Sequence, residues 1–404
     1  MHGLGVSSNR RMRTPSVLWL LVSLSVLSAC QGTSTGDLPK ASPAVPPVDL
    51  SHALVPIVPG LEIVTAVEDV GDDYESFKTI LESDPQRYRF SYSSLSRSDM
   101  QLHRAHSERD VSTADHVNAA QYRIAFNNGE RGPVAGTTAI SLSTAKFREL
   151  VGKGETRIDL VTTQGDMEGN PTPVVQSVDL KRDGGPIDFP VLVNNKMTRL
   201  PAIHALYRQN FDQALYPNTV DTEFHEGFTF LNDEVNPLAL RWQFLLWTLE
   251  VIRINNVQVH LVKSDPPAGS SPPARDAPAI LAQELEDGLA KRGVVEVPGI
   301  YFDTGSAVIR PESGPAIAAI AEALSRNAAL KVSVEGHTDN QGGQQYNLDL
   351  SRARAEAVRK ILIDKYAIDS GRMTTRGHGY AQPKADNSTL LGRSQNRRVE
   401  LVRL

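Results

Sequence analysis

The distribution of proline constrains the fold of this chain more than any other feature, because it divides the chain into separate pieces. Of 404 residues, 25 are proline, and they concentrate in residues 31–50 and residues 264–278. Proline lacks a backbone N–H and restricts the residue before it, so such runs interrupt helices and strands and form linkers. We therefore expect folded units at residues 51–263 and 279–404, with a flexible tether before the first and a semi-rigid spacer between them.

Composition excludes several functional classes. Apolar residues make up 40% of the chain and charged residues 22%, which is ordinary for units that bury a core. The 42 basic residues are outnumbered by 47 acidic ones, so nucleic acid is not an expected partner. A single cysteine rules out an intrachain disulfide framework and a Cys-rich zinc site. No cofactor is expected.

The first 29 residues have the pattern of a secretory signal peptide. Three arginines between residues 10 and 13 precede an apolar run at residues 17–27, and the small residues Ser28 and Ala29 follow. The apolar run is too short for a permanent transmembrane helix, which needs about 20 residues. A twin-arginine export signal is a weaker interpretation, because the residues beside the arginine pair fit that pattern poorly.

The only cysteine follows the predicted signal peptide directly. Leu27-Ser28-Ala29-Cys30 resembles the lipobox of bacterial lipoproteins. The resemblance implies that Cys30 becomes the new N-terminus and carries acyl chains such as palmitate, each methylene contributing about 0.8 kcal/mol of lipid partitioning. It also implies an outer-membrane location facing the periplasm, because Gln31 stands where an Asp can mark inner-membrane retention. The alternative is a chance free cysteine.

One motif in the tether is misleading. Residues 32–36 match the G-x-S-x-G pattern of serine hydrolases. That pattern needs a strand before it and a helix after it to expose the serine. Neither is predicted in this segment, so no hydrolase site is expected there.

Residues 51–263 alternate short apolar runs with turn residues, which is typical of a β-rich domain. Strands are expected at residues 61–64, 122–126, 158–161, 187–193, 228–231, 238–242 and 247–254. Helices are expected at residues 74–81 and 145–151. This domain resembles no family that we can name.

The β-rich domain shows no pattern that requires chemistry. A metal site could be assembled from His103, His106, Asp110 and His116, but their spacing is not that of a ligand set, and a polar helix or loop surface is the simpler interpretation. Asp159 and Glu250, in strand patterns, are expected to face solvent. No phosphate loop or zinc-protease motif occurs, so the sequence assigns this domain no activity.

Residues 279–404 predict an α+β unit with the order β-α-β-α-β-β and its helices on one face of a mixed sheet. Its expected elements are a helix over 280–291, a strand over 294–303 broken at Pro298, a helix from Pro315, a strand over 331–335, a helix from an Asn347 N-cap to Tyr366, and strands over 372–376 and 397–404. The long helix is expected to bury a stripe of Leu350, Ala353, Ala357 and Ile361.

A dense motif identifies this unit. The pattern G-H-T-D-x-x-G-x-x-x-x-N-x-x-L-S-x-x-R-A is met at every fixed position of residues 336–355. Further matching residues are Tyr301 to Ala307, Arg310 to Glu312, Gly377, Gly379, Gly392, Arg393 and Asn396 to Glu400. Together they resemble the OmpA-like, peptidoglycan-associating domain, over roughly residues 294–404.

The resemblance implies a ligand and its contacts. The ligand would be meso-diaminopimelate of the peptidoglycan stem peptide, with Asp339 on its ammonium group and Arg354 on a carboxylate. Such a pair complements a zwitterion, since a guanidinium binds a carboxylate in two-pronged fashion. Thr338 and Asn347 would support these contacts. The alternative is an Asp339–Arg354 ion pair that closes the loop without a ligand.

Three further residues of this unit have open roles. Arg397 and Arg398 are candidates for contact with the glycan or stem peptide, with Arg398 included in the predicted site. Pairing of one of them with Glu400 is equally consistent with the sequence. His337 is expected to pack in a buried position under the loop, although a role as ligand or base is open.

Two functions follow. The first is a lipid-anchored protein that tethers the outer membrane to peptidoglycan, with membrane lipid and other envelope proteins as further partners. The second is an enzyme or envelope-assembly factor whose activity lies in residues 51–263, with the C-terminal unit as a wall locator. No nucleophile–base pair is apparent, so the expected protein is not an enzyme. A flagellar stator is excluded, because a lipobox replaces its N-terminal transmembrane helix.

Overall fold

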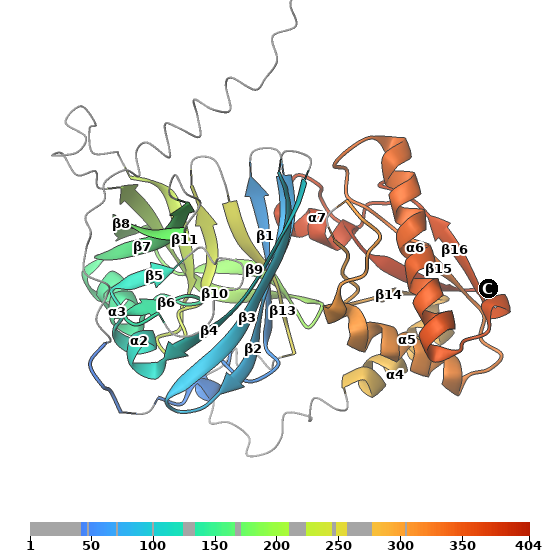
Figure 1. Cartoon of the computed structure of the whole chain (residues 1–404), viewed down its shortest axis with the longest axis horizontal. Helices are drawn as coiled ribbons and strands as arrows, with labels where there is room; N and C mark the ends of the chain where they lie inside the picture. Colours follow the sequence, from blue (N-terminus) through green and yellow to red (C-terminus); the bar gives the residue numbers. More distant parts are fainter. Residues whose placement is uncertain are drawn as a thin grey trace, which may run out of the picture.

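The computed structural model describes residues 42–46, 48–69, 72–98, 101–123, 134–165, 171–209, 224–244, 248–256, 277–303 and 305–404. The predicted signal peptide, Cys30, the motif at 32–36 and most of the two linkers lie outside these residues. Two sheets lie side by side, one in the β-rich domain and one in the C-terminal unit (Figure 1). No helix among the described residues is long and apolar enough to cross a membrane.

The β-rich domain is built on one large sheet of 13 strands in its described part. These are β1 (Glu62–Asp69), β2 (Asp72–Ser83), β3 (Arg87–Ser98), β4 (Gln101–Ser112), β5 (Gln121–Arg123), β6 (Thr137–Thr138), β7 (Glu155–Gly165), β8 (Pro171–Arg182), β9 (Ile187–Val193), β10 (Lys196–Gln209), β11 (His225–Leu231), β12 (Ala239–Gln243) and β13 (Thr248–Asn255). The order is β4-β3-β2-β1-β13-β12-β11-β10-β8-β7-β5-β6, and β9 pairs with β10 and β13. Helices η1 (Leu50–His52), α2 (Thr113–Asn118) and α3 (Thr144–Lys153) accompany the sheet.

Strands β1 and β2 are buried on both of their faces. Ile63 and Ile80 join a large apolar core inside the β-rich domain. Val64 and Phe77 point to the opposite face, where they meet apolar side chains of the C-terminal unit. Since side chains alternate along a strand, a strand buried on both faces loses the apolar–polar alternation that usually reveals it.

This two-sided burial explains why one strand of the β-rich domain was predicted as a helix. The predicted helix at 74–81 is wrong, because these residues belong to strand β2. Tyr74, Phe77 and Ile80 recur at a spacing of three, which imitates a helical face. The strand predicted at 187–193 matches β9, and the helix predicted at 145–151 lies within α3.

The C-terminal unit has the predicted α+β architecture. Its sheet has the order β14-β17-β15-β16. Strands β15 and β16 are parallel and the other pairs are antiparallel, so the sheet is mixed. The elements are α4 (Ala277–Arg292), β14 (Val294–Val297), η2 (Pro311–Ser313), α5 (Gly314–Arg326), β15 (Val332–Gly336), α6 (Gln344–Tyr366), η3 (Ser370–Arg372), β16 (Met373–Gly377), α7 (Leu390–Asn396) and β17 (Val399–Arg403).

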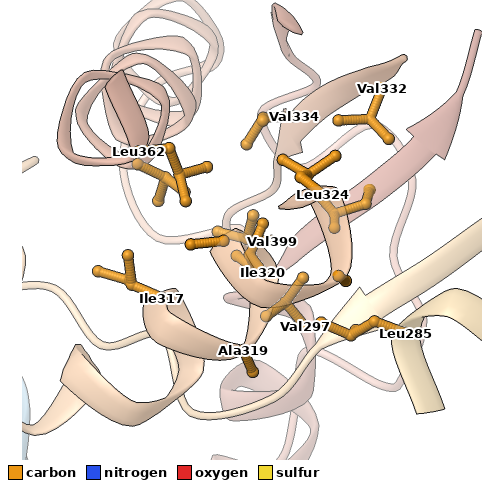
Figure 2. Close-up of a cluster of buried hydrophobic side chains, with 14 of the residues drawn as sticks. Leu285, Val297, Ile317, Ala319, Ile320, Leu324, Val332, Val334, Leu362 and Val399 are labelled. Carbon is orange, nitrogen blue, oxygen red and sulfur yellow. The ribbon is translucent and has the colours of Figure 1, made fainter. Parts of the chain in front are cut away.

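One apolar core joins helices α4, α5 and α6 to this sheet. Ile317, Ile320 and Leu324 of α5 lie beside Val334 of β15 and Leu362 of α6 (Figure 2). The predicted buried face of α5 is therefore confirmed. Helices on one face of a mixed sheet are likewise confirmed for α4, α5 and α6.

Helix α6 differs from its predicted burial. The expected stripe from Leu350 to Ile361 is wrong, because those positions are half-buried or exposed. The buried residues are Asn347, Ser351, Arg354, Ala355, Val358 and Leu362. The first turns of α6 thus bury polar side chains, and a pattern of apolar residues alone could not find this face.

Three boundaries also differ from expectation. Helix α6 begins at Gln344 with Gly343 as its N-cap, so Asn347 lies in the first turn and the predicted Asn347 cap is wrong. Residues 300–303 form only an isolated bridge between Phe302 and Ile309 in place of a strand. Helix α7 was not predicted, and it inserts between β16 and β17.

Candidate functional site

Two glycines let helix α6 lie directly on the strands beneath it. A Cβ on Gly336, at the end of β15, would stand 2.1 Å from the backbone oxygen of Ser351. A Cβ on Gly377, at the end of β16, would stand 2.4 Å from the backbone nitrogen of Arg352. Only glycine fits such approaches. They place the first turns of α6 beside the loop that leaves β15.

That loop holds Asp339 in a fixed position. The Thr338 amide donates to the Gly379 carbonyl at 2.9 Å, and Asp339 Oδ1 accepts from the Gln341 amide at 3.1 Å. Asn347 Nδ2 donates to the Gln341 carbonyl at 2.7 Å, so the first turn of α6 closes the loop. Thr338, Asp339 and Asn347 are buried, and the sequence prediction that they lie together is consistent with this geometry.

Arg354 lies near enough to Asp339 for their charges to interact, but its contacts are with other residues of the C-terminal unit. Its Nε donates to the Ser306 carbonyl at 2.9 Å, and its guanidinium stands 4.9 Å from the centre of the Phe302 ring. Burial, followed by the positive charge of Arg397, lowers the pKa of Arg354 to about 10. Arg354 remains charged at neutral pH, and its charge acts directly on that of Arg397.

Arg397 is the partner of Asp339. Its Nη1 donates to Asp339 Oδ2 at 2.5 Å, and its Nη2 donates to Glu75 Oε1, on strand β2, at 2.6 Å. Burial alone would lower the pKa of Arg397, but the charges of Glu75 and Asp339 outweigh it and raise the pKa. The pKa of Glu75 is lowered, because Arg397 and Arg253 outweigh its burial. We call Asp339, Arg354, Arg397 and Glu75 the charged cluster.

Comparison with known proteins identifies the family of the C-terminal unit. A family model described as "OmpA family" matches residues 301–397. These residues form an OmpA-family domain.

The similar proteins named below each match about a quarter of this chain. Outer membrane protein Omp38 of Acinetobacter baumannii is 43% identical over 25% of this chain and 28% of its own length. Outer-membrane lipoprotein YfiB of Pseudomonas aeruginosa is 40% identical over 26% of this chain and 61% of its own length. The chain therefore spans less than two thirds of each of these relatives. The solved peptidoglycan-associated lipoprotein from Burkholderia pseudomallei is 30% identical, covering 26% of this chain and 88% of that one, with a TM-score of 0.25.

Arg398 and His337 have structural partners inside the OmpA-family domain. Arg398 Nε donates to Glu400 Oε1 at 2.6 Å, which confirms the pairing that the sequence left open between two arginines. His337 is buried and stacks on His378 with ring centres 4.7 Å apart, as expected for a histidine packed under the loop. A contact between Arg398 and a ligand stays a prediction.

The sequence analysis did not predict the roles of two members of the charged cluster, Arg397 and Glu75. Arg397 was named beside Arg398, but two adjacent arginines offer no signal of which one turns toward Asp339. Glu75 lies in a segment that the pattern of apolar residues assigned to a helix, and nothing in the sequence relates it to a loop more than 260 residues away.

The candidate residues of the β-rich domain have other partners. His103 and His106 lie in strand β4, and no helix or loop surface forms there. Asp110 accepts from Arg89 Nε at 2.9 Å, and buried His116 lies 2.8 Å from the Val235 carbonyl. Among the residues that the structure describes, no three side chains of metal-binding type gather into a site.

Two acidic residues of the β-rich domain were predicted to face solvent. Glu250 Oε2 lies 3.4 Å from Arg241 Nε, and burial raises the pKa of Glu250. Asp159 is half-buried and accepts from Ser177 Oγ at 2.6 Å. The predicted solvent position is wrong for Glu250, whose side chain is only 14% exposed. Asp159 alternates with buried Ile158 and Leu160 along β7, so it lies on the opposite face, which is consistent with its prediction.

Proposed function

We propose that this chain binds peptidoglycan non-covalently through its OmpA-family domain and so tethers the outer membrane to the cell wall. The observation that carries the proposal is that Asp339 binds the half-buried Arg397 and that its charge also acts on the buried Arg354. The names of similar proteins support it, since they include an outer-membrane lipoprotein and a peptidoglycan-associated lipoprotein.

The ligand that this arrangement suits best is a zwitterion. The carboxylate of Asp339 would accept from the ammonium group of meso-diaminopimelate, and a guanidinium would bind its carboxylate. Thr338 and Asn347 would hold the loop in place. The Thr338 hydroxyl is buried and has no hydrogen-bond partner among the described residues, which is consistent with a group that a ligand completes.

The proposal places the N-terminus in the outer membrane. Cys30 would carry the acyl chains after removal of residues 1–29, and residues 31–41 would span part of the periplasm. The predicted tether is shorter than residues 31–50, because Ser42 bonds to Asp115 and Leu50 is buried in the core of the β-rich domain. Binding of the wall would then be strengthened by confinement of the OmpA-family domain close to it. No catalytic step is proposed for the wall.

Co-sedimentation of residues 277–404 with purified sacculi tests this function. These residues contain the C-terminal sheet, its helices and their shared core. Asp339→Ala and Arg354→Ala should each lower the bound fraction at least tenfold. Asp349→Ala and Arg352→Ala are matched controls, because both side chains are exposed on the same helix and pair with each other. Sacculi with lysine in place of diaminopimelate should bind less, since lysine lacks the second carboxylate.

Equal sedimentation of the wild type, Asp339→Ala and Arg354→Ala would overturn the proposal. Equal binding to both kinds of sacculi, with loss in the two variants, would keep wall binding and reject diaminopimelate as the recognised group.

A further inference from the structure

The β-rich domain packs against the OmpA-family domain (Figure 1). In this arrangement Glu75 of β2 reaches Arg397 of the OmpA-family domain. Phe77 of β2 meets the Tyr301 ring edge-on at 5.0 Å, and the guanidinium of Arg310 lies 4.0 Å from the centre of the Phe77 ring. One apolar cluster combines both domains, with members Val64, Ala66, Phe77, Leu192 and Ile252 from one and Tyr301, Leu390 and Leu391 from the other.

Polar contacts surround this apolar cluster. Arg253 Nη2 donates to the Ser394 carbonyl at 2.9 Å, and Arg393 Nη2 donates to Glu68 Oε1 at 3.0 Å. Asn255 Nδ2 donates to the Tyr301 hydroxyl at 2.8 Å. An apolar centre with a polar surround is the usual anatomy of a specific interface, so the two domains dock in one defined arrangement.

Glu75 is the part of this interface that enters the candidate ligand site. Its carboxylate binds Arg397, the same side chain that binds Asp339. Its negative charge also acts on Arg354. Two carboxylates thus face two guanidinium groups, and the charged cluster is balanced without a ligand.

If Glu75 moved away from Arg397, the positive and negative charges of the charged cluster would no longer be equal. Asp339 would face Arg354 and Arg397 alone, leaving one positive charge in excess. A buried guanidinium without a counter-charge is unfavourable, so the vacated site would favour an incoming carboxylate. In the docked arrangement Asp339 and Arg354 are 7% and 6% exposed, which leaves little surface for a ligand to contact.

We propose that Glu75 is an internal competitor, whose carboxylate occupies the place of the ligand's carboxylate, so that wall binding requires the β-rich domain to leave the OmpA-family domain. This inference rests on the proposed function. Inter-domain contacts of this mixed polar and apolar kind are the type that open and close. The β-rich domain would then control when the tether engages the wall.

The test measures sacculus binding by the whole chain from residue 31. Glu75→Gln, which keeps the shape and removes the charge, should raise the affinity about tenfold over the wild type. Glu82→Gln is the matched control, because Glu82 lies on the same strand and pairs with Arg87 on the surface. It should bind as the wild type does. The double variant Glu75→Gln, Asp339→Ala should not show the tenfold rise in affinity. That result would show that the rise depends on the ligand site at Asp339.

A second variant opens the interface without touching the charged cluster. Phe77→Ala removes the ring between Tyr301 and Arg310 and should also raise binding, with circular dichroism checking that the β-rich domain stays folded. Unchanged or weaker binding by Glu75→Gln would overturn the inference. If residues 277–404 alone bind in an Asp339-dependent way while Glu75→Gln changes nothing, only the inference fails. If residues 277–404 alone do not bind sacculi, the proposed function itself is overturned, and the inference about Glu75 falls with it.

Discussion

Gly336 and Ser351 touch through their backbones, since a Cβ on the glycine would lie 2.1 Å from the serine carbonyl oxygen. This contact sets the distance between strand β15 and helix α6. The same contact fixes the loop of Asp339 relative to Arg354, one turn of α6 beyond Ser351. A packing requirement therefore explains the glycine that begins the G-H-T-D motif.

Substitution Gly336→Ala should destabilise the OmpA-family domain by about 3 kcal/mol, because the new methyl group meets backbone that cannot rotate away. Urea unfolding of residues 277–404, followed by circular dichroism, measures this loss. Gly314→Ala is the control: no atom lies within 4 Å of a Cβ there, and its φ of −51° is helical. Similar stabilities for the two variants would show that α6 can shift without penalty.

Asn347→Ala should loosen the loop of Asp339. Asn347 is buried, and its hydrogen bond to the Gln341 carbonyl is partly buried, so we expect a cost of about 1 kcal/mol and faster hydrogen exchange at the amide of Gln341. Sacculus binding should fall as well, because the carboxylate is no longer held in place. Gln345→Ala, an exposed change on the same helix turn, should leave both measurements unchanged.

Arg397→Ala should destabilise the docked domains, because it leaves the carboxylates of Asp339 and Glu75 without their shared cation. Breaking such a pair costs about 3 kcal/mol. Glu75→Gln should then recover part of the loss, so a double-mutant cycle on the whole chain should give a coupling of at least about 1 kcal/mol. Additive effects would show that Glu75 and Arg397 do not interact in solution.

Glu400 should make stability depend on pH in the acid range. The ring of His337, 3.6 Å from the carboxylate, and the guanidinium of Arg398 lower the pKa of Glu400 from 4.5 to about 2. The unfolded state therefore takes up the proton first, so this stabilisation is complete above pH 4.5 and is lost as the pH falls toward 2.

The pH dependence can be measured by urea unfolding of residues 277–404 between pH 6 and about pH 2.5. Wild type should lose on the order of 2 kcal/mol more than Glu400→Gln over this interval. Glu284→Gln, a change at an exposed position of α4, should follow the wild type. Parallel curves for wild type and Glu400→Gln would contradict the assignment.

Local patterns predicted the parts of this protein that depend on neighbours in sequence. The burial of Ile317, Ile320 and Leu324 follows from helical spacing, and the strand at 187–193 follows from its apolar residues and flanking turns. The pattern failed where both faces of an element are buried, as in β2, and where a helix buries polar side chains, as at Asn347 and Arg354 of α6.

The sequence by itself indicated an OmpA-family domain over roughly residues 294–404, and the family model matches residues 301–397. It also predicted that Asp339, Arg354 and Asn347 share one site, because the motif holds them at set spacings along one strand, loop and helix. Only the tertiary structure decided that Arg397, and not Arg398, binds Asp339, since two adjacent arginines differ only in the direction that the backbone gives them. It alone also brought Glu75 to this site. That contact depends on how two separately folded sheets pack, and packing between distant segments leaves no periodic trace in a sequence.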